Sequence, residues 1–153
     1  MKLSCALVAT LLLACSSSLF AGSFPNNCAG TYLIQEGGGA TSLWTLEADG
    51  VFLGTSSSQE LFHFTNQQGT WEKDGNQGVK AVQLDFSFDG GGALINIGRV
   101  DIQLRTVGEG CANVAGTFSL RFFEAGEDPL NPATDTGTPI TDTFTGRRLT
   151  VAP

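Results

Sequence analysis

The sequence Val82-Gln83-Leu84-Asp85-Phe86-Ser87-Phe88 alternates apolar and polar side chains without a break, and Asp89-Gly90-Gly91-Gly92 ends the run. Successive side chains of a β-strand point to opposite faces, so this stretch predicts a strand with one apolar and one polar face. We expect the apolar side chains to face a core and the polar side chains to face solvent. The glycines that follow are typical of a turn between neighbouring strands.

Shorter runs of the same kind lie on both sides of this stretch, separated by glycine-rich turns. Asp49-Gly50 between two of them is a typical signal for a tight hairpin. The expected strands cover residues 32–36, 43–48, 51–55, 62–64 (separate from or continuous with 69–73), 82–88, 100–105, 114–122 and 140–151. No stretch of residues 22–153 repeats apolar side chains at helical spacing over three turns, so we predict an all-β protein.

About eight short strands joined mostly by tight hairpins favour a single antiparallel up-and-down barrel, which leaves no free sheet edge. A two-sheet sandwich is the alternative. Three similar triplets, Gly30-Thr31-Tyr32, Gly69-Thr70-Trp71 and Gly116-Thr117-Phe118, are expected to begin the first, fourth and seventh strands. There an aromatic ring can cover the bare glycine backbone of a curved sheet.

The first residues carry the pattern of an export signal. Lys2 precedes an apolar run over residues 3–14, and small residues follow, which predicts a signal peptide of residues 1–21 cleaved after Ala21. Alternatively, residues 12–15 resemble the lipobox of bacterial lipoproteins, with Cys15 as the lipid-bearing residue. Either way we expect one exported domain over residues 22–153, secreted, periplasmic or anchored by Cys15 to the outer membrane. That anchor is the only membrane attachment we expect.

Charge and cysteine content restrict the partners and the compartment. Fifteen acidic and eight basic residues give a formal net charge of −7, which repels phosphate backbones, so no nucleic-acid partner is expected. Cys28 and Cys111 are the pair outside the export segment, and an even pair in an oxidising compartment predicts a disulfide. A redox-active thiol is the weaker alternative, because the chain has no C-x-x-C motif.

Catalytic and cofactor motifs are absent from the sequence. It has no Gly-x-Ser-x-Gly elbow, no His-Glu-x-x-His and no phosphate-binding glycine loop that leads into a helix. His63 is the single histidine, so a multi-histidine metal site is excluded. Asp128, Asn131 and Asp135 miss the spacing of a calcium loop and are interpreted as loop formers. We therefore expect neither a metal nor a cofactor.

Two barrel families resemble the chain in pattern. The glycine-Thr-aromatic triplets, the hairpin over residues 43–50 and the closing run over residues 144–149 are similar to uncharacterised bacterial exported proteins of the allene oxide cyclase-like and dirigent-like barrel group. The match includes no catalytic motif, so no active-site residue follows from it. A lipocalin-like arrangement is the second resemblance, with Gly30-Thr31-Tyr32 in place of that family's Gly-x-Trp and with Arg147 or Arg148 packed over the ring.

These patterns support three functional hypotheses. The first is a non-catalytic barrel that binds a small apolar ligand or a partner protein, provided that its aromatic side chains line a cavity rather than fill the interior. Its expected lining residues are Trp44, Trp71, Phe86, Phe118, Phe122 and Arg148. The second is a cyclase- or isomerase-type enzyme, which requires at least two members of a carboxylate and arginine set to lie inside the barrel. That set is Asp85, Asp101, Arg105 and Arg121. The third is a purely structural or interaction protein of the cell envelope.

Overall fold

The computed structural model describes residues 28–124, 126–135 and 137–151. The expected signal peptide, its cleavage site at Ala21 and the lipid-acceptor candidate Cys15 lie outside the described residues. Cys28, one partner of the predicted disulfide, is the first residue described.

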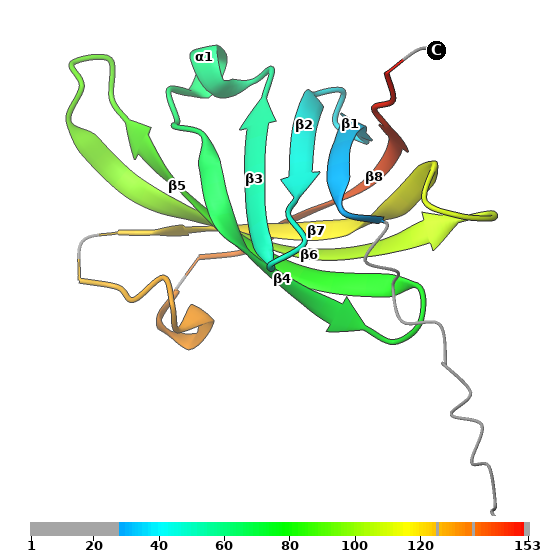
Figure 1. Ribbon diagram of the computed structural model, residues 1–153. Helices are drawn as coiled ribbons and strands as arrows, with labels where there is room; N and C mark the ends of the chain where they lie inside the picture. Colours follow the sequence, from blue (N-terminus) through cyan, green and yellow to red (C-terminus); the bar gives the residue numbers. More distant parts are fainter. Residues whose placement is uncertain (1–27, 125, 136, 152–153) are drawn as a thin grey trace, which may run out of the picture.

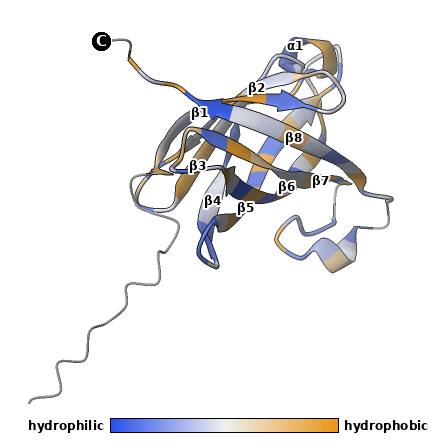
Figure 2. Cartoon of the chain, turned by 90° about the vertical axis from the view of Figure 1, so that its right-hand side faces the viewer, coloured by the Kyte–Doolittle hydropathy of each residue, from blue (hydrophilic) through white to orange (hydrophobic). Residues whose placement is uncertain are grey.

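Eight antiparallel strands form a closed up-and-down barrel, in which each strand pairs with its neighbours in sequence and β1 pairs with β8 (Figure 1). The strands are β1 Gly30–Glu36, β2 Thr41–Leu46, β3 Val51–Ser56, β4 Gln67–Asp74, β5 Gly78–Phe88, β6 Leu94–Val107, β7 Asn113–Phe123 and β8 Ile140–Arg148. The all-β barrel expected from the sequence is confirmed, and the two-sheet alternative is wrong. Alternation of hydrophobic and hydrophilic residues can be followed along the strands in Figure 2.

A single helical turn, α1 (Gln59–Phe62), lies in the β3–β4 connection and overlaps, at Phe62, the strand predicted over residues 62–64. The Gln59 side chain explains the difference, since its Oε1 accepts hydrogen bonds from the Ser56 backbone and the Thr55 hydroxyl and so favours a local turn. His63 ends the turn in the left-handed conformation with φ of 52°, and Phe64 alone pairs as an isolated bridge with Ser87. No helix within the described ranges is long and apolar enough to cross a bilayer.

The barrel has two chemically different ends. At one end, which we call the α1 end, lie α1, the β1–β2 and β5–β6 turns and the β7–β8 connection with its short helix η2 (Pro132–Thr134). At the other, the disulfide end, Cys28 before β1 is bonded to Cys111 in the β6–β7 turn, with a Cα–Cα distance of 5.2 Å. The predicted disulfide is thus confirmed, and it fixes the start of the barrel to a turn 83 residues away.

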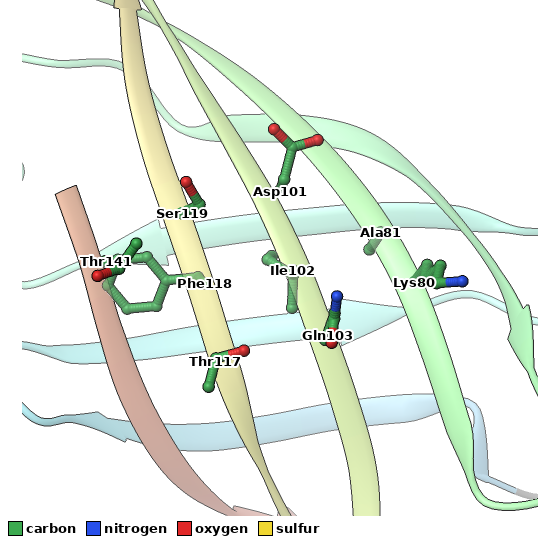
Figure 3. A pocket seen from close by; sticks show the side chains of 9 residues that line it. All are labelled: Lys80, Ala81, Asp101, Ile102, Gln103, Thr117, Phe118, Ser119 and Thr141. Atoms are coloured by element: carbon green, nitrogen blue, oxygen red, sulfur yellow. The ribbon is translucent and has the colours of Figure 1, made fainter. Parts of the chain in front are cut away.

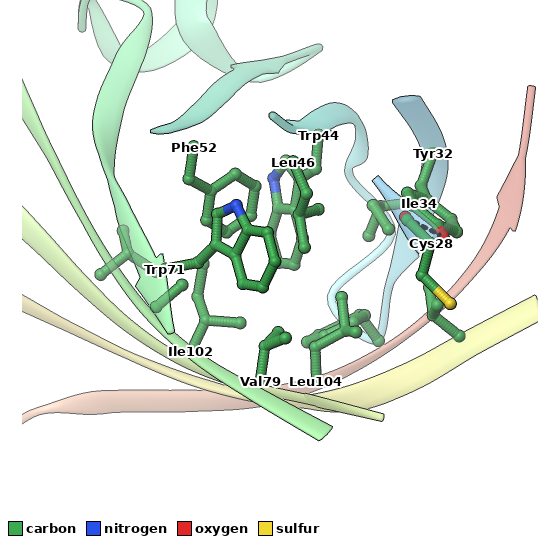
Figure 4. Close-up of a cluster of buried hydrophobic side chains, with 14 of the residues drawn as sticks. Cys28, Tyr32, Ile34, Trp44, Leu46, Phe52, Trp71, Val79, Ile102 and Leu104 are labelled. Atoms are coloured by element: carbon green, nitrogen blue, oxygen red, sulfur yellow. Dashed lines mark hydrogen bonds between the residues drawn. The ribbon is translucent and has the colours of Figure 1, made fainter. Parts of the chain in front are cut away.

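Apolar side chains fill the interior at the disulfide end (Figure 4). The Tyr32 hydroxyl donates a 2.8 Å hydrogen bond to the Cys28 carbonyl, and the Trp71 indole donates one of 2.9 Å to the Glu47 carbonyl. Both rings are therefore buried without leaving their polar atoms unpaired. The other side chains of this cluster include Ile34, Leu46, Phe52, Val79, Ile102, Leu104, Val114 and Phe144.

The three glycine-Thr-aromatic triplets lie on β1, β4 and β7, as expected, but only Gly30 begins its strand. Gly69 and Gly116 lie inside theirs. A Cβ atom at Gly69 would lie 1.8 Å from the Val82 carbonyl oxygen, and one at Gly116 would lie 1.9 Å from that of Gln103. These two glycines therefore permit a close approach of the neighbouring strand's backbone.

The prediction for the faces of β5 is wrong. Gln83 and Asp85 point into the barrel with 0% and 5% of their surface exposed, whereas Phe86 points outward and is 48% exposed. The strand begins at Gly78, four residues before the predicted start at Val82. Near this beginning, Val79 and Ala81 belong to the core. Because successive side chains alternate between the two faces, the inward direction of Val79 and Ala81 also places Gln83 and Asp85 on the inner face.

Candidate functional site

The interior is open at the α1 end, where it forms a cavity of about 550 Å³ to which every strand contributes. This volume lies in the range of small-molecule sites, roughly 300–1,000 Å³. The interior is therefore filled at the disulfide end and hollow at the α1 end. The main lining residues are Glu36, Trp44, Ser56, Phe62, Phe64, Gln67, Asp85, Ser87, Asn96, Val100, Phe118, Leu120, Phe122, Ile140 and Asp142.

Polar and apolar side chains both line the cavity wall. Gln67, Asp85, Ser87 and Asn96 line it from β4, β5 and β6. Apolar side chains reach it from β6, β7, β8 and α1. These are Val100, Phe118, Leu120, Phe122, Ile140 and Phe62. The cavity thus suits a ligand that has both polar and apolar groups.

Asp85 is the buried carboxylate of this wall. Its Oδ2 accepts a long, 3.4 Å hydrogen bond from the Gln67 amide. Burial raises the pKa of the Asp85 carboxyl above its ordinary value, and the Gln67 hydrogen bond opposes that effect only in part. Asp85 is therefore easier to protonate than an aspartate at the surface.

Two glycines on inward positions make room for the polar side chains. Gly98 faces Asp85 across the β5–β6 pair, and a Cβ atom at residue 98 would lie 2.5 Å from Asp85 Oδ1. A Cβ atom at Gly54 would lie 2.7 Å from Gln67 Oε1 and 2.8 Å from Gln83 Nε2. The Asp85 carboxyl thus occupies space that a larger residue at position 98 would fill, and the Gln67 and Gln83 amides do the same at position 54.

Several buried polar atoms of this region have no hydrogen-bond partner among the described residues. They are Trp44 Nε1, Asn96 Oδ1 and both amide atoms of Gln83. Trp44 and Asn96 line the cavity, and Gln83 lies on the same inward face as Asp85. An unpaired buried donor or acceptor costs about 1–3 kcal/mol, so a ligand or solvent that pairs with Trp44 Nε1 and Asn96 Oδ1 from the cavity would stabilise the protein.

Two further carboxylates reach the cavity from the β1–β8 side. Ser42 donates a 2.5 Å hydrogen bond to Glu36 Oε1, and the Gly38 backbone N–H donates one of 2.6 Å to Asp142 Oδ2. Both groups are thus held in place by the first hairpin and its turn. Among the described residues that line the cavity, none is lysine, arginine or histidine.

Of the six residues predicted to line a ligand site, Trp44, Phe118 and Phe122 do so. Trp71 lies in the packed core at the disulfide end. Phe86 lies on the outer surface because of the inverted faces of β5.

Arg148, the sixth of these residues, is inside the barrel at the disulfide end rather than at the cavity. It faces Tyr32 in the β1–β8 register, and its Nη2 donates a 2.5 Å hydrogen bond to the Ala29 carbonyl. Its Nε would lie 3.0 Å from a Cβ atom at Gly30, so the guanidinium covers the bare backbone of that glycine.

The predicted carboxylate and arginine set does not assemble. Only Asp85 is inside the barrel. Asp101 binds Arg99 on the outer face, Arg105 is exposed, and Arg121 forms a 2.9 Å salt bridge with Asp135 of the β7–β8 connection. The enzyme hypothesis needs at least two of the four inside, and this arrangement does not provide them.

A second hollow, of about 510 Å³, lies on the outer face of β5–β8 (Figure 3). Figure 3 shows Asp101, Gln103, Thr117 and Ser119 along it. Its charged side chains are already paired, Lys80 with Asp74 at 3.1 Å and Asp101 with Arg99 at 2.6 Å. This groove carries none of the unpartnered buried atoms found among the described residues.

Sequence reasoning missed Gln67, Gln83 and Asn96, as well as the two glycines that accommodate them. The available signal was a glycine inside a strand, as at Gly54 and Gly98, which often marks a close approach by another group. That signal does not identify the approaching group, because the cross-strand register is needed to pair Gly98 with Asp85. The loop residues behave as predicted: Asp128 and Asn131 accept hydrogen bonds from backbone groups of their own loop.

Comparisons of the chain with models of protein families, with curated proteins and with solved structures find no match.

Proposed function

We propose that this barrel binds a small amphipathic molecule in the cavity at its α1 end and does not transform it. The observation that carries the proposal is a pair of buried polar atoms on cavity-lining residues, Trp44 Nε1 and Asn96 Oδ1, which have no hydrogen-bond partner among the described residues, at a cavity of about 550 Å³. Native proteins pair most of their buried polar groups, and exceptions concentrate where a ligand or water completes the structure.

The mixed polar and apolar lining of the wall favours an amphipathic ligand over the purely apolar one expected from the sequence. A purely apolar ligand would cover Gln67, Asp85 and Asn96 without replacing their hydrogen bonds, which is unfavourable. A ligand with a polar edge can pair with these groups, while its apolar side contacts Phe118 and Leu120.

Binding without chemistry fits the composition of the wall. Asp85 is the sole member of the predicted acid-base set in the cavity, and the serines that line it have no histidine or lysine beside them among the lining residues. Activation of a serine nucleophile requires such a base. The Cys28–Cys111 bond supports export to an oxidising compartment, where a carrier of this kind would act.

The proposal is tested with the neutral fluorophore N-phenyl-1-naphthylamine and two adjacent residues of β7. Leu120 points into the cavity, and Ser119 lines the outer groove. We expect Leu120→Trp to weaken fluorophore binding by about tenfold or more, and Ser119→Trp to leave it within about twofold, since tenfold corresponds to about 1.4 kcal/mol. Circular dichroism confirms that each variant is folded.

Ile140→Trp serves as a second cavity variant, because Ile140 lies at the more exposed edge of the lining and tolerates a larger ring with less strain. If Ser119→Trp abolished fluorophore binding while Leu120→Trp and Ile140→Trp kept it, the fluorophore would bind in the outer groove and not in the cavity. No binding by the wild-type protein would refute the proposal.

A further inference from the structure

The cavity carries negative charge from three different strands. Glu36 of β1, Asp85 of β5 and Asp142 of β8 all line it, and no basic side chain does so among the lining residues described. The arginines with assigned partners bind elsewhere: Arg99 and Arg121 on the outer face, and Arg148 at the disulfide end. The potential inside the cavity is therefore negative, and low-dielectric walls strengthen it.

The same region presents buried groups that have no partner among the described residues. Gln83 is fully buried, and neither its amide oxygen nor its amide nitrogen is hydrogen-bonded there. Trp44 is 2% exposed and has a free indole N–H, and Asn96 contributes a free carbonyl oxygen. Together with the carboxylates, these atoms form a polar wall with more acceptors than donors.

Aromatic rings also line the wall. Phe118 and Phe122 reach the cavity from β7, and Phe62 and Phe64 reach it from α1 and the residues after it. The face of an aromatic ring attracts a cation, with a free energy of about 0.5–2 kcal/mol. Aromatic rings together with carboxylates are a combination that suits an organic ammonium group.

From this geometry we infer that the ligand of the cavity is an organic cation, an ammonium group on a small apolar or aromatic body. The inference rests on the proposed binding function. An ammonium N–H placed beside Asp85 supplies the counter-charge that this buried carboxylate lacks, and it donates to acceptors such as Asn96 Oδ1. A carboxylate or phosphate ligand would instead meet three like charges.

The test compares three probes of the same shape by isothermal titration calorimetry: 2-phenylethylamine, 2-phenylethanol and 3-phenylpropanoate. We expect the amine to bind about tenfold or more tightly than the alcohol, and the carboxylate to bind more weakly than either. Asp85→Asn should weaken amine binding by about tenfold while leaving alcohol binding within about twofold.

Asp101→Asn is the matched control, because Asp101 is a carboxylate of the outer groove. This substitution should leave the affinities for 2-phenylethylamine and 2-phenylethanol unchanged. Equal affinity for amine and alcohol, no binding of the amine, or loss of amine binding in Asp101→Asn instead of Asp85→Asn would each overturn the inference. If N-phenyl-1-naphthylamine still binds in those cases, the proposed binding function stands; if it does not bind either, that function fails as well.

Discussion

Gly98 lies directly opposite Asp85 across the β5–β6 pair, and a methyl group at residue 98 would lie only 2.5 Å from the Asp85 carboxylate. The carboxylate therefore occupies the space that a side chain at position 98 would fill. The existence of a polar wall inside this barrel thus depends on a glycine that belongs to the neighbouring strand.

Gly98→Ala is expected to impair binding more than folding. The new methyl group meets the end of a side chain, which can rotate away and displace the carboxylate from the polar wall. Gly69→Ala should do the opposite, because its methyl group would lie 1.8 Å from a backbone oxygen that cannot rotate away. We expect Gly69→Ala to lower the free energy of unfolding by about 3 kcal/mol or more, and Gly98→Ala by about 1 kcal/mol.

Urea unfolding, together with the 2-phenylethylamine titration, measures both effects. A Gly98→Ala protein with wild-type affinity for the amine would contradict the role given to Asp85. A Gly69→Ala protein of wild-type stability would contradict the close strand approach at β4 and β5.

Asp85→Asn is expected to stabilise the unliganded protein at neutral pH. Burial raises the pKa of Asp85, so the folded protein binds a proton more readily than the unfolded chain does. Stability therefore falls as pH rises from the ordinary aspartate value, 3.8, through the raised pKa, and above it the buried charge remains a cost. Asparagine removes that charge.

Urea unfolding at a series of pH values gives the comparison. The advantage of the Asp85→Asn protein should be present at pH 7 and shrink as pH falls toward the ordinary aspartate value, where both proteins are neutral at this position. Asp101→Asn should bring no gain in stability at pH 7, because Asp101 is paired with Arg99 at 2.6 Å. An Asp85→Asn protein that is less stable than wild type at pH 7 would show that the charged form is the favoured one.

Amine binding should weaken as pH falls, because protonation neutralises the carboxylates that attract the ammonium group. Asp85 loses its charge at a higher pH than an aspartate at the surface does, since burial raises its pKa. The other titratable groups that face the cavity are Glu36 from β1 and Asp142 from β8, and no described lining residue of β2, β3, β4, β6 or β7 titrates. Calorimetry with 2-phenylethylamine across pH measures the profile, and Asp85→Asn should make the affinity depend less on pH. An affinity for the amine that stays constant as the pH falls to the ordinary aspartate pKa, 3.8, would contradict this prediction.

Removal of the disulfide should destabilise the barrel without closing the cavity. Cys28 and Cys111 are 83 residues apart, and the chain-entropy model gives about 4 kcal/mol for a loop of this size. We expect Cys28→Ser/Cys111→Ser to lower the free energy of unfolding by about 2–5 kcal/mol while the folded fraction still binds N-phenyl-1-naphthylamine, because the bond lies at the opposite end from the cavity. Unchanged stability would show that the bond contributes little to holding β1 in place.

The sequence was sufficient to predict the barrel. Alternation along β5, β6 and β7 and the glycine-rich turns between them are local signals, and up-and-down pairing results when neighbouring strands are joined by short turns. The apolar inward face of β7, with Val114, Phe118 and Leu120, results from the same alternation. The α1 turn was missed because the side-chain hydrogen bonds of Gln59 replace the strand that Phe62 and Phe64 suggest.

The site was predicted only in part, because its position depends on register. Phe86 looked like a core residue and Asp85 like a surface one, since alternation reveals two faces but does not say which is inside. The packing of Val79 into the core, near the start of β5, decides which face of the strand is inside. The space for Asp85 comes from Gly98, and their pairing depends on the three-dimensional arrangement of two strands.

The central claim is that the cavity at the α1 end is the binding site, and the two indole groups of the chain test it most directly. Trp44 lines the cavity and its Nε1 has no hydrogen-bond partner in the part of the chain that the structure describes, whereas the Trp71 indole donates to the Glu47 carbonyl at the other end of the interior. In a proton–nitrogen correlation spectrum, assigned with Trp44→Phe, saturating N-phenyl-1-naphthylamine should shift the Trp44 indole signal and leave that of Trp71 in place. A Trp44 signal that stays unchanged at concentrations where fluorophore binding is saturated would contradict the account.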